Sequence, residues 1–82
     1  MTQTLATPAR SWDALSSTRL QGVHPHLVRG MTRALAEAPF PFRVIDGLRT
    51  IARQKELVRI GASRTMRSRH LTGHAVDIVP LV

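Results

Sequence analysis

The 82-residue chain contains no cysteine and no tyrosine, and its aromatic residues are limited to Trp12, Phe40 and Phe42. Without cysteine, neither disulfide bonds nor thiolate zinc ligands can stabilise so small a chain, so any metal ligands must be His, Asp or Glu. The scarcity of aromatic side chains argues against a nucleic-acid binder that stacks bases on aromatic platforms.

Acidic residues are also few. Five acidic residues stand against twelve basic ones, giving a net charge of +7, and all but one of the basic residues are arginine. This balance favours anionic partners such as nucleic acid, acidic lipid or the carboxylate- and phosphate-rich bacterial cell wall. The first residues lack the basic segment and apolar run of a secretory signal, and no stretch approaches membrane-spanning length. We therefore expect no membrane insertion, and a cytoplasmic protein until something else releases it.

The length predicts one domain over residues 1–82. A chain of this size buries only roughly 60% of the surface that it exposes when unfolded, so we expect marginal stability. Residues 1–19 mix Ser, Thr, Pro and Arg with isolated apolar residues. They predict a loosely ordered N-terminal segment with at most one helical turn around residues 12–15. The core is expected to be small.

The segment from residue 24 to 38 has the periodicity of an amphipathic helix. Pro25 suits the first helical position, and Pro39 ends the run. Its predicted apolar face consists of Leu27, Val28, Met31, Ala34, Leu35 and Ala38.

The second half of the chain predicts a strand, a helix, a loop and a second strand. Residues 42–46 alternate and are bulky, which is typical of a short strand. Residues 51–60 predict a helix with Thr50 as N-cap and Gly61 at its end. Residues 62–69 are polar and without period, and residues 74–79 predict the second strand. The order indicates an α+β fold, although an isolated pair of strands is marginal in water.

The motif SRHLTGHAVD, residues 68–77, places two histidines and an aspartate around a glycine. A catalytic zinc site without cysteine uses imidazole and carboxylate ligands and leaves one position for water. His70 and Asp77 could supply two ligands, with Gly73 allowing a tight turn between them. If the strand starts near His74, alternation sends the His74 side chain to the face opposite Asp77. This spacing is equally compatible with an ordinary hydrogen-bonded turn.

The same ten residues resemble the S-x-H-x-x-G-x-A-x-D signature of the zinc D,D-carboxypeptidase and L-alanyl-D-glutamate endopeptidase family, which includes several phage endolysins. Residues 20–25, LQGVHP, resemble the start of the first helix in the endolysin branch. The central block of that branch is similar to DGLRT, residues 46–50, together with Gln54, Leu57, Gly61 and Ser63. The resemblance implies a small domain in which helices pack on a short antiparallel sheet, and a zinc peptidase acting on the peptidoglycan stem peptide.

The resemblance also implies roles for single residues. It makes His70 and Asp77 zinc ligands, and makes Arg49 the arginine that binds the substrate carboxylate or polarised carbonyl. Without the resemblance, Arg49 would be interpreted as a surface arginine at a helix start. Ser68 matches the serine that lines the substrate groove, although alone it is a loop hydroxyl.

Weaker matches concern three further residues. Gln54 and Ser63 are weaker substrate-binding candidates, better explained as support for the helix and the loop. His24 matches the pattern, but a histidine at a helix start more often caps or packs, so we do not expect it to bind metal. His26 carries no signal.

The sequence departs from the family after Asp77. Members carry a downstream E-x-x-H element that provides the general base and the third zinc ligand, whereas this sequence ends at Val82. The strands that complete the sheet are expected to be missing too, and neither Asp46 nor Glu56 is expected to replace the lost groups. Loss of the base removes about 10² to 10⁴ in rate, so we expect a truncated peptidase with little activity.

Three functions compete on this basis. The first is hydrolysis of the bond between L-alanine and D-glutamate, with cleavage of D-alanyl-D-alanine as a related alternative. The second is a small basic nucleic-acid-binding module, and the third is a wall- or zinc-binding remnant without turnover. The nucleic-acid module would use Arg59, Arg64, Arg67 and Arg69 on phosphates. The sequence does not define an oligomeric state.

Overall fold

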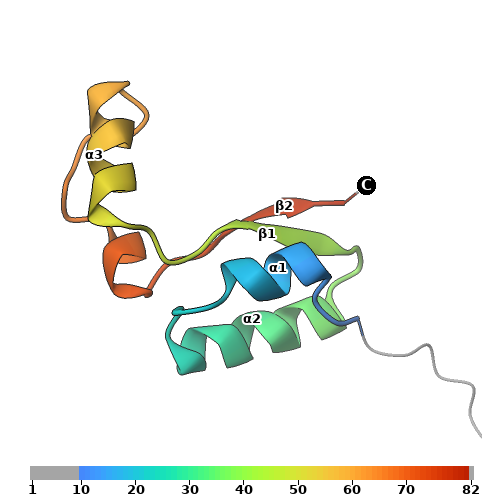
Figure 1. The fold of residues 1–82 in the computed structure, drawn as a ribbon. Helices are drawn as coiled ribbons and strands as arrows, with labels where there is room; N and C mark the ends of the chain where they lie inside the picture. Colours follow the sequence, from blue (N-terminus) through green and yellow to red (C-terminus); the bar gives the residue numbers. More distant parts are fainter. Residues whose placement is uncertain (1–9, 82) are drawn as a thin grey trace, which may run out of the picture.

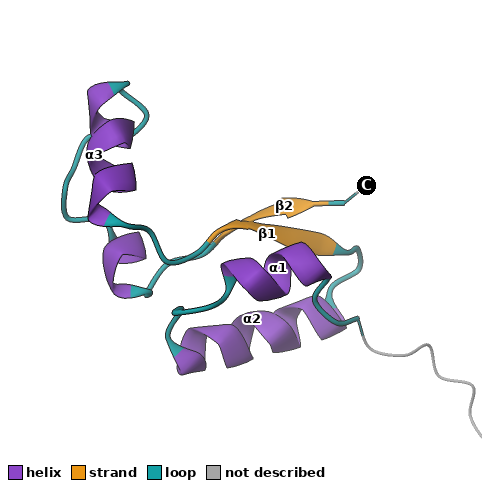
Figure 2. Cartoon of the chain, viewed as in Figure 1, coloured by secondary structure: helices purple, strands orange, loops and turns teal. Residues whose placement is uncertain are grey.

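The computed structural model describes residues 10–81 as two helices on one side of a two-stranded sheet, with a third helix and a short 3-10 helix beyond the end of that sheet (Figure 1). In chain order the elements are α1 (Ala14–Arg19), α2 (Pro25–Glu37), β1 (Phe42–Asp46), α3 (Ile51–Arg59), η1 (Arg69–Thr72) and β2 (Asp77–Pro80). This confirms the α+β class and the packing of helices on a short antiparallel sheet (Figure 2). None of the helices within residues 10–81 is long and apolar enough to cross a membrane.

α1 corrects part of the prediction for residues 1–19. A regular helix covers residues 14–19 where a loosely ordered segment with one turn at residues 12–15 was expected, while residues 1–9 lie outside the described part of the chain. The helix begins at Asp13, whose Oδ1 accepts a hydrogen bond from the Ser16 amide at 2.8 Å. Ser16 is fully buried, and its Oγ accepts from the Val44 amide at 2.8 Å. A polar contact to β1 therefore fixes this helix.

α2 confirms the amphipathic prediction, with Pro25 first and the helix ending before Pro39. His24 is its N-cap, and its Nδ1 accepts from the His26 amide at 3.2 Å. Only Leu35 of the predicted apolar face is buried. The core cluster consists of Leu20, Val23 and Val44, with Trp12, Leu27, Val28 and Val76 packed against it. The core is small, as expected.

The two strands are antiparallel, and β1 lies where it was predicted. β2 begins at Asp77, three residues later than the predicted start at His74. The His74 amide donates to the Arg69 carbonyl at 2.9 Å, so it closes the η1 turn and cannot join the sheet. Asp46 pairs with Asp77 across the strands, with a register irregularity between Val44 and Asp46.

α3 also follows its prediction closely. The Thr50 side chain accepts from the Arg53 amide at 3.0 Å, which confirms the N-cap. The helix ends at Arg59, one residue early, and Gly61 follows with a φ of +80°. Residues 62–68 contain no helix or strand, in agreement with the predicted loop.

Candidate active site

The turn that carries His70 is held by its caps. Ser68 Oγ accepts from the His70 amide at 3.2 Å, and Gly73 ends η1 in the left-handed region with a φ of +77°. A Cβ on Gly73 would lie 2.4 Å from the Gly22 carbonyl oxygen, and the Gly73 carbonyl accepts from the His24 amide at 2.8 Å. Only glycine fits this close approach, so the glycine of the motif seats the turn against the start of α2.

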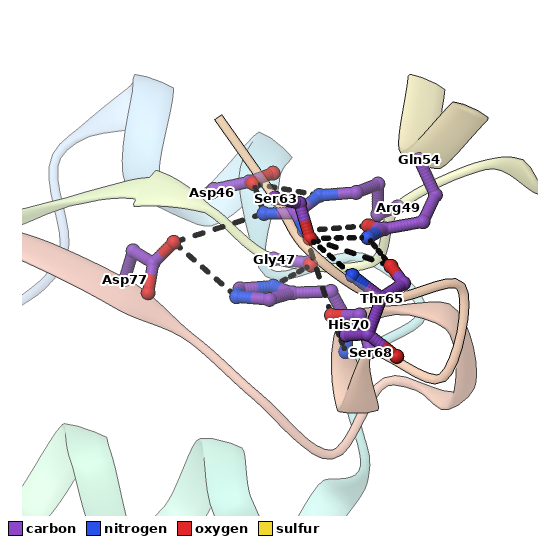
Figure 3. Close-up of polar contacts among 9 residues, drawn as sticks. All are labelled: Asp46, Gly47, Arg49, Gln54, Ser63, Thr65, Ser68, His70 and Asp77. Atoms are coloured by element: carbon purple, nitrogen blue, oxygen red, sulfur yellow. Dashed lines mark hydrogen bonds and ion pairs between the residues drawn. The ribbon is translucent and has the colours of Figure 1, made fainter. Parts of the chain in front are cut away.

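The His70 ring is buried, and its two nitrogens have different partners (Figure 3). Nδ1 lies 2.7 Å from the Gly47 carbonyl oxygen, which can only accept, so Nδ1 carries the proton. Nε2 then presents a lone pair, and it lies 3.2 Å from Asp77 Oδ2. Two acceptors that face each other are favourable only with a proton or a metal cation between them. A carbonyl that fixes the far nitrogen is the usual support of a metal-binding histidine.

Asp46 joins this pair, which sequence reasoning did not anticipate. Within residues 10–81, Asp46, His70 and Asp77 form the one group of potential metal ligands, with ligand atoms all within 4.8 Å of one another. One imidazole and two carboxylates suit zinc and other divalent cations. The available signal was the placement of Asp46 at the end of β1 and Asp77 near the start of β2, which become neighbours once the strands pair antiparallel.

Arg49 lies beside this group and is largely buried, with only 9% of its side chain exposed. Its Nε donates to Asp46 Oδ2 at 3.1 Å, and its Nη2 forms an ion pair with the same oxygen. Nη1 donates to Gln54 Oε1 at 2.8 Å and to Ser68 Oγ at 3.5 Å. Nη2 also lies 3.8 Å from Asp77 Oδ2. The structure thus brings Arg49, Ser68, His70 and Asp77 together, and the surface-arginine interpretation of Arg49 is wrong.

Gln54 and Ser63 lie behind Arg49. Gln54 is fully buried, and its Nε2 donates to Ser63 Oγ at 2.9 Å and to the Thr65 carbonyl at 2.6 Å. These contacts agree with support of the helix and the loop, which is the explanation that the sequence favoured for Gln54 over substrate binding. Ser63 is bonded to Gln54 and does not reach Arg49 in the described contacts.

The other histidines form a separate stack. The His24 ring lies 4.9 Å from the His74 ring and 5.0 Å from the His26 ring, measured between centroids. His74 Nδ1 lies 2.8 Å from Thr72 Oγ1. None of the three belongs to the group around His70. His24 caps α2, as expected of a histidine at a helix start.

These features define a small α+β domain in which a group of His and Asp side chains that could hold a metal ion lies beside a buried arginine. Comparison with known proteins places it: the family described as phage L-alanyl-D-glutamate peptidase matches residues 11–82, and the chain belongs to this family.

Two relatives illustrate the match. The L-alanyl-D-glutamate peptidase of Escherichia phage T5 is 33% identical over 70 residues, which cover 82% of this chain and 51% of that protein. The crystal structure of the Serratia marcescens L-Ala D-Glu endopeptidase ChiX is similar with a TM-score of 0.79 and 54% identity, covering 88% of this chain and 54% of that chain. The chain therefore spans about half the length of the relatives that it matches.

Proposed function

We propose that this chain acts in a zinc-dependent L-alanyl-D-glutamate endopeptidase that cleaves the stem peptide of bacterial peptidoglycan. The observation that carries the proposal is the His70 Nε2 and Asp77 Oδ2 pair, 3.2 Å apart beside Arg49, in a chain of this family. The names of both relatives refer to the same peptide bond. The positive charge of the chain suits an anionic wall, and we propose that the protein stays in the cytoplasm until it is released to that wall.

Zinc suits the donor set, because imidazole and carboxylate are its usual ligands where cysteine is absent. When bound, the metal would activate a water molecule and polarise the scissile carbonyl. His70 and Asp77 would hold it, with the Gly47 carbonyl keeping the His70 tautomer that leaves Nε2 free. Arg49 places a fixed positive charge next to these ligands, where charge develops on the carbonyl oxygen during attack.

No described carboxylate is free to act as general base. The Asp46 carboxylate is paired with the Arg49 guanidinium. Glu56 is paired with Arg59 on the exposed side of α3, with 2.9 Å between Glu56 Oε2 and Arg59 Nε. We therefore expect residues 1–82 alone to turn over stem peptide slowly, because general-base catalysis contributes about 10² to 10⁴ in rate.

Calorimetric titration with zinc tests the metal part. We expect one-to-one binding that is lost in His70→Ala and kept in His26→Ala, because His26 is exposed and lies outside the group around His70. Equal binding by His70→Ala would contradict the site.

The proposed substrate is tested by mass spectrometry of peptides that have been incubated with the protein. The protein is used at the full length that its gene encodes. Two peptides are offered, one with an L-alanyl-D-glutamate bond and one ending in D-alanyl-D-alanine. Cleavage of the first supports the proposal, and cleavage of the second alone would favour the carboxypeptidase alternative.

A further inference from the structure

The Arg49 guanidinium has almost no hydrogen-bonding capacity left for a ligand. A guanidinium carries five N–H donors, one on Nε and two on each Nη. Asp46 Oδ2 faces the Nε donor and one Nη2 donor, while Gln54 Oε1 and Ser68 Oγ face the two donors of Nη1. One donor remains, on Nη2, the atom that lies 3.8 Å from Asp77 Oδ2.

The partners hold the guanidinium from two sides (Figure 3). Asp46 is fixed by its place at the end of β1, opposite Asp77. Gln54 is fixed by burial and by its bonds to Ser63 and to the Thr65 carbonyl. The Arg49 amide also donates to the His70 carbonyl at 2.8 Å, so the backbone of the arginine is tied to the turn that carries the histidine.

We propose that Asp46 and Gln54 are positioning residues that lock the Arg49 guanidinium and leave it one N–H, on Nη2, for a single substrate oxygen beside His70 and Asp77. This inference rests on the proposed function and refines the role of the arginine. Bidentate binding of a carboxylate requires two parallel donors, and the contacts of Arg49 leave only one. The remaining donor fits the single oxygen of the scissile carbonyl, and the contacts of Arg49 exclude a two-point hydrogen bond to a substrate carboxylate.

The positioning role extends to the loop after α3. Gln54 Nε2 bonds to Ser63 and Thr65, so the same carboxamide that accepts from Arg49 holds residues 63–65 against α3. A carboxamide suits both tasks because its oxygen accepts and its nitrogen donates. Glutamate at this position would keep the acceptor for Arg49 and lose the donors for the loop, which allows the two tasks to be separated.

The locking is tested by NMR of the side-chain N–H groups of arginine, which needs neither metal nor substrate. We expect separate, slowly exchanging Nη signals for Arg49 in the wild-type chain, and averaged signals in Asp46→Ala and Gln54→Met. Arg59 is the internal reference, because it forms an ion pair of the same i, i+3 spacing with Glu56 while 70% of its side chain is exposed. Its signals should be averaged throughout, and Glu56→Ala should leave Arg49 unchanged. Averaged Arg49 signals in the wild type, or locked signals in both site variants, would overturn the inference.

Kinetics of the chain at its full encoded length supply the second readout. We expect kcat on the L-alanyl-D-glutamate peptide to fall about tenfold or more in Asp46→Ala and Gln54→Met with KM nearly unchanged, because misplacing a catalytic group by about 1 Å can cost 10²-fold. Gln54→Glu should recover most of the lost kcat. A rise in KM with kcat unchanged, or no recovery of kcat by Gln54→Glu, would overturn the positioning role. Absence of turnover in the wild type with locked Arg49 signals would instead contradict the proposed function and leave the lock standing.

Discussion

Asp46 and Asp77 face each other as partners in the antiparallel pair of strands, with Arg49 in contact with both carboxylates. Like charges directly opposite in a sheet are destabilising, so this pairing needs a cation. The guanidinium supplies one within the chain. The same relationship that assembles the candidate metal group therefore also makes Arg49 part of the folded structure.

Replacing Arg49 by methionine should destabilise the fold. The change leaves the two facing carboxylates without their cation and the buried Gln54 oxygen without its donor, and an unsatisfied buried polar group costs about 1–3 kcal/mol. The free energy of unfolding from urea titration gives the measurement. Arg59→Met is the matched control, since its exposed ion pair with Glu56 should be worth at most about 1 kcal/mol. Equal stability of Arg49→Met and the wild type would contradict the role of Arg49 as the cation of this pair.

The left-handed turn at Gly73 predicts an opposite response of two glycines to the same change. Gly73→Ala should cost at least about 1–2 kcal/mol from the left-handed backbone, and more from the approach to the Gly22 carbonyl oxygen. Gly30→Ala lies in the middle of α2 with no atom within 4 Å of the added Cβ. It should stabilise the protein by about 0.5–1 kcal/mol. Thermal unfolding of both variants and of the wild type measures these two effects. A Gly73→Ala protein as stable as the wild type would show that the turn is not held as described.

Asp13 should make the stability depend on pH below 4. Its hydrogen bond from the Ser16 amide, with the Arg43 guanidinium as a further cause, lowers the pKa of the Asp13 carboxyl from 3.8 to about 2. A carboxyl whose pKa is lower in the folded state stabilises the fold above its unfolded pKa, and this contribution is lost as pH falls from about 4 to about 2.

Asp13→Asn keeps an N-cap acceptor and removes the charge, so the loss of stability between pH 4 and pH 2 should be smaller than in the wild type. Unfolding in urea across this range gives the slopes. Glu37→Gln, which alters an exposed i, i+4 pair with Arg33, should keep the wild-type slope. Identical slopes for Asp13→Asn and the wild type would rule out Asp13 as the cause.

Local signals in the sequence were sufficient for β1, α2 and α3. Alternation defines residues 42–46, and Thr50 and Gly61 mark the ends of α3 within one residue. β2 was placed too early because the His74 amide serves the turn of η1 through the Arg69 carbonyl, which no local pattern reveals.

The candidate site likewise contains residues whose placement could be predicted from the sequence and residues whose placement could not. His70 and Asp77 lie within one motif, so their pairing could be predicted from spacing and resemblance. Asp46 lies 31 positions before Asp77, and its approach depends on strand register, which is set by tertiary pairing. The burial of Gln54 likewise follows from the loop at residues 63–65 folding back onto α3, a long-range contact that its own position in the helix does not indicate.

Ser16 explains why α1 was not anticipated, and it yields the last prediction. Six residues are too few for a helical apolar stripe, and the residue that α1 buries fully is a serine whose Oγ accepts from the Val44 amide. Ser16→Ala would leave that buried amide without a partner, so the free energy of unfolding should fall by about 1–3 kcal/mol. Ser17→Ala, on the exposed side of the same helix, should change it by no more than about 0.5 kcal/mol. If the two variants unfold at the same urea concentration, the serine contact does not hold α1 to the sheet, and apolar packing of Leu20 must do so instead.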